Sequence, residues 1–184
     1  MMWRQGIGPC RRPVIVKIQG VLMYQHIVAS IDESNNASQA LEQAIAVAKL
    51  AGAQLHLVHI VNLFELALEE VVLADKAKLA ELAHRHGEAR LEGAAAQARA
   101  AGLEPSLFIA ECWGGGDEIA DGLLNYARSV PADLLVLGTH GRSGLMHMML
   151  GSVAESVMRQ ADMPLLVVRS ETSEHTPGKR RPVL

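Results

Sequence analysis

The stretch DLLVLGTHGRSGLMHMMLGS, residues 133–152, begins with a continuous apolar run, passes through three glycines and ends on a Gly-Ser pair. The apolar run over 133–138 predicts a strand that is buried on both faces. Glycine this dense lets a chain turn sharply or lets a ligand approach the backbone closely. Because Ser152 to Gln160 then has the pattern of a helix, the stretch predicts a strand, a glycine-rich loop and a helix in succession.

The same alternation of strand and helix continues on both sides of this stretch. Buried strands are predicted at 26–30, 55–61, 106–111 and 164–168, and helices at about 37–52, 74–101 and 117–129. Apolar residues are continuous along the strands, which is typical of a parallel sheet covered by helices on both faces. The sequence therefore predicts a single α/β domain that is Rossmann-like. Ligands of such open sheets bind beyond the carboxyl ends of the strands, where the stretch 138–152 begins.

Three known glycine motifs do not fit that stretch. A Walker-type phosphate loop needs a lysine directly after its second glycine, but Leu145 follows Gly144. A dinucleotide-binding turn needs glycines after the first strand, where this chain has Asp32-Glu33-Ser34-Asn35. A hydrolase nucleophile elbow needs one residue between its serine and the next glycine, whereas Ser143 and Gly144 are adjacent.

The spacing that does occur is Gly-x2-Gly-x9-Gly-Ser, formed by Gly138, Gly141, Gly151 and Ser152. This pattern resembles the nucleotide-binding branch of the universal stress protein family. The resemblance covers residues 24–168 and includes an aspartate at the end of the first strand, in VASIDES, and the helix start LGSVAESVMRQA. It implies a five-stranded sheet of order 3-2-1-4-5. It also implies a stress-response regulatory protein that binds ATP or AMP, with or without Mg²⁺. We expect binding rather than turnover, because the residues near the proposed phosphates include no obvious catalytic groups.

The resemblance assigns a ligand-binding part to individual residues. Gly138 and Gly141 would leave amide groups free to face phosphate oxygens, and the helix start at Gly151 would favour an anion. Arg142 is an additional candidate phosphate contact, on charge and position alone. The expected site comprises Ser30, Ile31 and Asp32 at the nucleoside, Ile60 and Leu137 at the adenine, and Gly138, His140, Gly141, Gly151, Ser152 and Val153 at the phosphates. The chain departs from many relatives in having Met146 to Met149 where they carry basic residues.

Composition narrows the classes of partner and compartment. Residues 23–168 carry nine basic and 18 acidic side chains, a charge of −9 that disfavours nucleic-acid binding. No apolar run approaches the roughly 18 residues of a membrane span, and two cysteines fit a reducing cytoplasm. Residues 1–22 are expected to be an extension outside the domain at 23–169, and 170–184 a flexible tail. Neither His56 and His59 nor His84 and His86 are spaced for a metal site, so all four are interpreted as structural or solvated.

A homodimer is expected, because the implied strand order puts PLLVV at a sheet edge and Leu165 to Val168 carries no charge to deter pairing. A further, unidentified protein partner is compatible with a regulatory role. Two other functions stay open: a slow ATP-hydrolysing enzyme of a related fold, and an interaction module without nucleotide. No residue is assigned a catalytic or metal-binding role, because no carboxylate is predicted close to the phosphates.

Overall fold

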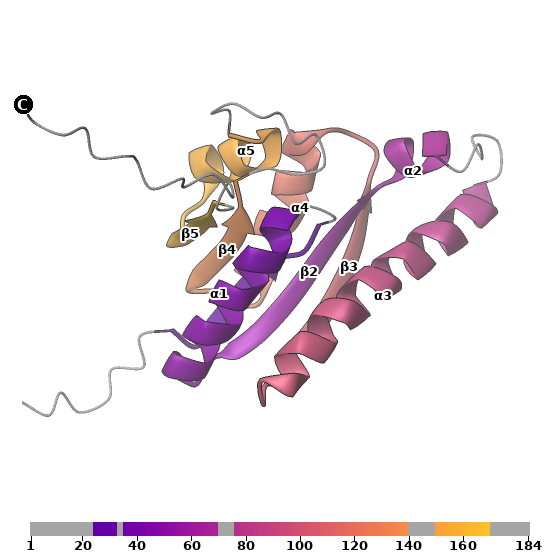
Figure 1. Ribbon diagram of the computed structural model, residues 1–184. Coiled ribbons are helices and arrows are strands. Elements are labelled where there is room, and N and C mark those ends of the chain that lie inside the picture. The colour runs from indigo at the N-terminus through magenta and orange to yellow at the C-terminus, as the bar shows by residue number, and fades with distance from the viewer. Residues whose placement is uncertain (1–23, 33–34, 70–75, 140–149, 170–184) are drawn as a thin grey trace, which may run out of the picture.

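Five parallel strands lie in the order β3-β2-β1-β4-β5, which confirms the expected topology. The computed structural model describes residues 24–32, 35–69, 76–139 and 150–169 (Figure 1). Within them the two halves of the sheet extend outward from β1, so the strand order reverses between β1 and β4. The strands are β1 (His26–Ser30), β2 (Gln54–Asn62), β3 (Ser106–Cys112), β4 (Leu134–Gly138) and β5 (Leu165–Val168).

Helices cover both faces of this sheet, as predicted. The helices are α1 (Asn35–Ala51), α2 (Leu63–Glu69), α3 (Lys76–Ala100), α4 (Gly116–Ser129) and α5 (Ser152–Gln160). One face is packed by α1 and α3 and the other by α4 and α5, while α2 lies beyond the end of β2 (Figure 1). Among the described residues no helix is long and apolar enough to cross a membrane.

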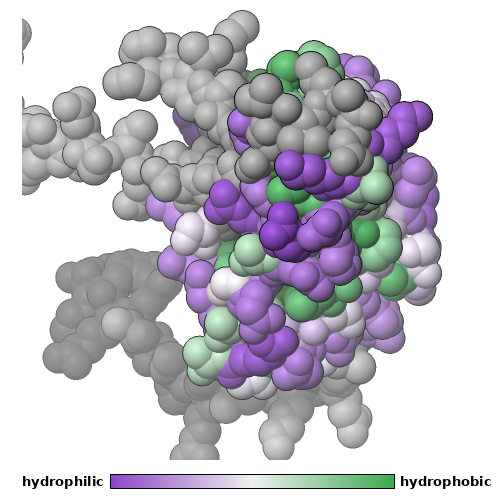
Figure 2. All heavy atoms as spheres, turned by 90° about the vertical axis from the view of Figure 1, so that its right-hand side faces the viewer, coloured by the Kyte–Doolittle hydropathy of each residue, from purple (hydrophilic) through white to green (hydrophobic). Residues whose placement is uncertain are grey.

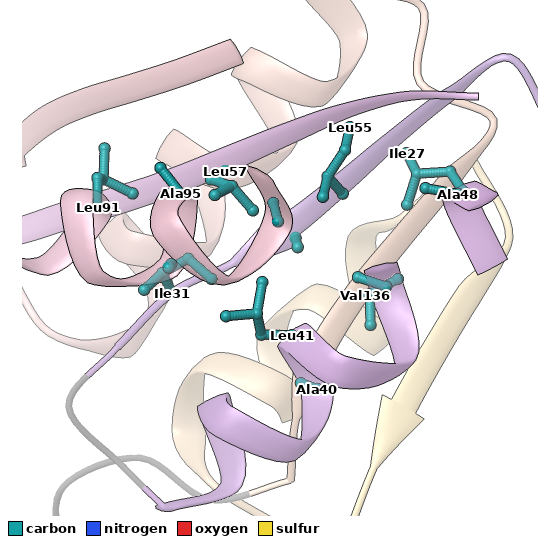
Figure 3. Close-up of a cluster of buried hydrophobic side chains, with 14 of the residues drawn as sticks. Ile27, Ile31, Ala40, Leu41, Ala48, Leu55, Leu57, Leu91, Ala95 and Val136 are labelled. Atoms are coloured by element: carbon teal, nitrogen blue, oxygen red, sulfur yellow. The ribbon is translucent and has the colours of Figure 1, made fainter. Parts of the chain in front are cut away.

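The core is aliphatic and continuous along the central strands. β2 is buried at every position from Leu55 to Val61, which matches a sequence run that is apolar except at His56 and His59. On the α1 and α3 face, leucine and isoleucine side chains from the sheet pack against alanines of the helices, as between Leu57 and Ala95 (Figure 3). Figure 2 shows that hydrophilic side chains cover much of the outer side of the molecule where α3 lies.

Two glycines allow helices to pack closely on the sheet. A Cβ at Gly87 of α3 would lie 2.8 Å from Cγ2 of Ile109 in β3. A Cβ at Gly122 of α4 would lie 3.2 Å from Cδ1 of Ile60 in β2. The two helices therefore approach opposite faces of the sheet near its carboxyl end. This packing brings residues of both helices to the carboxyl ends of the strands.

The short helix α2 was not predicted from the sequence. The side chain of Asn62 begins it, because its Oδ1 accepts hydrogen bonds from the backbone N–H of Phe64 at 3.0 Å and of Glu65 at 3.2 Å. Leu63, Leu66 and Ala67 are then buried in a cluster with α3. The helix thus depends on a tertiary contact with α3.

Candidate functional site

A pocket opens at the carboxyl ends of β1, β2 and β4, next to the point where the strand order reverses. The first turns of α4 and α5 line one side of it, and α2 and α3 line the other. This is the place where open parallel sheets bind their ligands.

The pocket gathers most of the residues that the sequence assigned to the site. Those of the expected set that line it are Ser30, Ile31, Asp32, Ile60, Leu137, Gly138, Gly151, Ser152 and Val153. His140, Gly141 and Arg142 lie outside the described residues. Segments more than one hundred residues apart in the sequence, such as those of Asp32 and Ser152, therefore face one cavity.

The side next to α5 has backbone suited to an anion. Gly151 precedes the first turn of α5, and its N–H donates to the carbonyl of Thr139 at 2.8 Å, which holds the start of the helix against the end of β4. The first backbone N–H groups of a helix lack partners within it, and the helix dipole adds to the attraction of a negative charge. Ser152 contributes a hydroxyl group at the same place.

The start of α4 lies directly against the start of α5. A Cβ at Gly116 would lie 2.7 Å from Cβ of Ser152 and 2.9 Å from its carbonyl carbon, and it would also collide with Oγ. Only glycine permits this approach. Gly115 and Gly116 line the pocket together with Ser152, although neither glycine is in the site expected from the sequence.

On the side of the pocket away from α5, hydrogen bonds hold the carboxyl ends of β1 and β2 in place. His59 donates from Nδ1 to the carbonyl of Ile31 at 2.7 Å, and the N–H of Ile31 donates to the carbonyl of Val58 at 2.8 Å. These hydrogen bonds fix the backbone of Ile31. The next residue, Asp32, has a half-buried side chain that lines the pocket. Asn62 donates from Nδ2 to the carbonyl of Gly114 at 3.0 Å, which connects α2 to the turn before α4.

Several residues of the lining were missed by the sequence reasoning. His59 and His86 had been interpreted as structural or solvated, and Glu65 lies in a helix that was not predicted. The additional lining residues are His59, Val61, Asn62, Glu65, Leu66, His86, Gly115, Gly116, Ile119, Thr139 and Ala154. The positions around Ile60 could have been found, because they also lie at the carboxyl end of a strand. Glu65 and His86 could not, since only the packing of α2 and α3 brings them there.

The thiol near the glycine turn is kept neutral. Burial raises the pKa of Cys112, and the nearby carboxylates of Glu118 and Glu65 raise it further. Its Sγ lies 3.8 Å from the carbonyl oxygen of Gly114. In the described part of the chain, no group of three or more histidine, cysteine, aspartate or glutamate side chains is placed to hold a metal ion.

Comparison with known proteins identifies the family. The model of the universal stress protein family matches residues 23–169. The chain belongs to this family. Universal stress protein YxiE of Bacillus subtilis is 30% identical over 153 residues, which cover 80% of this chain and 100% of the relative.

Two solved universal stress proteins are complexes with a nucleotide. One, in complex with cAMP, superposes with a TM-score of 0.53 at 25% identity and covers 79% of this chain and 97% of its own. The other, from Archaeoglobus fulgidus and in complex with dAMP, has a TM-score of 0.55 at 22% identity. The match covers 79% of this chain and 98% of the Archaeoglobus chain. Members of the universal stress protein family thus bind adenine nucleotides.

Proposed function

We propose that this chain binds an adenine nucleotide, ATP or AMP, and acts as a regulatory protein of the stress response. The observation that carries the proposal is that one pocket brings Asp32, Ile60 and Leu137 together with Gly151 to Val153. An apolar floor beside a carboxylate suits a nucleoside, and a helix start with a glycine suits phosphate oxygens. The cAMP and dAMP complexes of related proteins support the same ligand class.

We propose that the site prefers adenine over guanine through contacts near Ile60 and Leu137, which line the pocket together with Asp32. Adenine presents a donor at N6 and an acceptor at N1, whereas guanine presents an acceptor at O6 and a donor at N1, so backbone groups that match one base oppose the other. We expect ATP to bind at least about tenfold more tightly than GTP, a difference of roughly 1.4 kcal/mol.

Calorimetry with the wild type and Gly151→Val tests the phosphate end. The added side chain would fill the approach to the α5 amides, so ATP affinity should fall by about two orders of magnitude, while Gly93→Ala, on an exposed stretch of α3, should bind as wild type. Equal ATP binding by wild type and Gly151→Val would refute the phosphate assignment. Mass spectrometry of the ligand released from the purified protein would identify the nucleotide, and calorimetry with and without Mg²⁺ would show whether the ion takes part in binding.

We further propose that nucleotide is held rather than turned over. Hydrolysis needs a group that positions or deprotonates water at the phosphorus atom, and the expected phosphate contacts at Gly138 and Gly151 to Val153 supply mainly backbone N–H groups. Single-turnover ATP cleavage with Mg²⁺, compared between wild type and His140→Ala, tests this. A rate of about 1–10³ s⁻¹ that the substitution abolishes would make the protein an enzyme.

The proposed assembly is a cytoplasmic homodimer joined through β5. Within the described part of the chain β5 pairs only with β4, so its outer edge has unpaired backbone groups. Pairing with the same strand of a second copy would satisfy them. The small number of cysteines favours a reducing compartment. We propose that an unidentified protein partner binds the nucleotide-bound form in preference to the free form.

A further inference from the structure

A buried hydroxyl ties α4 to α5 within one turn of the pocket. Ser156 of α5 is 1% exposed, and its Oγ donates to Oδ1 of Asp117 in the first turn of α4 at 2.5 Å. Gln160 donates from Nε2 to the same Ser156 oxygen at 2.8 Å. The hydroxyl therefore both donates and accepts, which is the condition for burying it without a penalty.

Arg159 completes the cluster from the outside. Its Nη2 lies 3.2 Å from Oδ1 of Asp117 and 3.3 Å from Oγ of Ser156. The guanidinium thus offsets a carboxylate that would otherwise stand as an uncompensated negative charge near a phosphate site. Because the Asp117 side chain is 78% exposed, the ion pair itself contributes little to stability. Its importance lies in where it holds the two helices.

The cluster lies directly behind the place where the two helices meet. Asp117 follows Gly116, and Gly116 packs against Ser152. Ser156 lies one helical turn after Ser152. The starts of α4 and α5 are therefore fixed by two contacts in succession, one at the pocket wall and one a turn behind it.

We propose that Asp117 and Ser156 are a positioning pair for the phosphate end of the pocket. The pair sets the separation and direction of the two helix starts, so that the N–H groups near Gly116 and those near Ser152 face the same anion. Charge-assisted hydrogen bonds weaken steeply when donors move out of line. This inference rests on the proposed nucleotide-binding function and adds to it the residues that hold the phosphate-facing backbone in place.

The matched variants Asp117→Asn and Asp117→Ala test the pair. Both remove the same charge at an exposed position, but only asparagine keeps an oxygen that can accept from Ser156. We expect ATP to bind the alanine variant roughly fivefold more weakly than the asparagine variant, the effect of about one neutral hydrogen bond. Adenosine, which has no phosphates, should bind both variants within about twofold. A role limited to stabilising the fold would move ATP and adenosine together.

Ser156→Ala tests the same pair from its other member. It should also weaken ATP without weakening adenosine, whereas Leu55→Val, a core change on the opposite face of the sheet, should lower Tm and leave the ratio of the two affinities unchanged. If the asparagine and alanine variants of Asp117 bind ATP equally, the positioning inference is wrong. If the wild type itself does not bind ATP, the proposed function fails first, so the two failures are distinguishable.

Discussion

Nδ1 of His26 and Nε2 of His56 lie 3.2 Å apart across the neighbouring strands β1 and β2, at the end of the sheet opposite the pocket. The other nitrogen of His56 lies 3.1 Å from the hydroxyl of Tyr126 in α4. Tyr126 in turn stacks on Phe108 with 4.1 Å between ring centroids. Two histidines can share such a hydrogen bond only while at least one of them is neutral.

Acidification should therefore destabilise the protein through His56. Burial lowers the pKa of His56 from its usual value near 6.5, and the neighbouring His26 lowers it further. The unfolded chain then binds a proton more readily than the folded one, so this contribution to stability is complete above pH 6.5 and is lost as pH falls through the lowered value. Urea unfolding at pH 7.5 and at pH 5.5 should show the loss.

His56→Gln should reduce that dependence on pH while lowering stability at both values. His84→Gln is the matched control, because His84 is exposed on α3, where its Nε2 lies 3.1 Å from Oε1 of Glu88. If His56→Gln keeps the full difference between the two pH values, another group causes it.

A pair of glycines on α3 should respond in opposite directions to the same change. Gly87→Ala places a methyl group 2.8 Å from Cγ2 of Ile109, so it should destabilise the fold by about 1–3 kcal/mol. Gly93→Ala meets nothing within 4 Å and should stabilise the helix by about 0.5–1 kcal/mol. Chemical denaturation of both variants measures the difference. Equal effects would mean that α3 does not pack on β3 as closely as described.

Val167→Lys should convert the proposed dimer to a monomer. The substitution adds a charge to the edge strand β5, where pairing with a second copy would otherwise occur. Leu107→Lys, on the opposite edge strand β3, is the control that should leave the dimer intact. Light scattering gives the masses, and circular dichroism checks that both variants are folded. A dimer that survives Val167→Lys would place the interface elsewhere.

A shortened chain from Met23 to Ser170 should be nearly as stable as the full chain. Every described strand and helix lies between these residues. We expect Tm to change by no more than about 2–4 °C, the shift that ~1 kcal/mol produces in a domain of this size. A larger fall in a thermal melt would show that residues 1–22 or the tail pack on the domain.

The sequence by itself determined the strands and most of the helices of this protein, because their signals are local. The run from Leu55 to Val61, which is apolar except at His56 and His59, indicates a strand buried on both faces, and the helix start at Ser152 follows a glycine. The glycine spacing and the position of Asp32 indicated the family and, through it, the strand order.

The tertiary structure alone decided what faces the pocket from α2, α3 and α4. Asn62 is a local start signal for α2, but the helix is short and its leucines are buried only by packing on α3, which also brings Glu65 to the pocket. His56 and His59, three residues apart on β2, lie on opposite faces, where one joins Tyr126 and the other lines the pocket. Ser156 and Asp117 are 39 residues apart and meet only because α4 and α5 cover the same face of the sheet. Local patterns record whether a residue is buried, but the identity of its neighbours depends on contacts between segments that are distant in the chain.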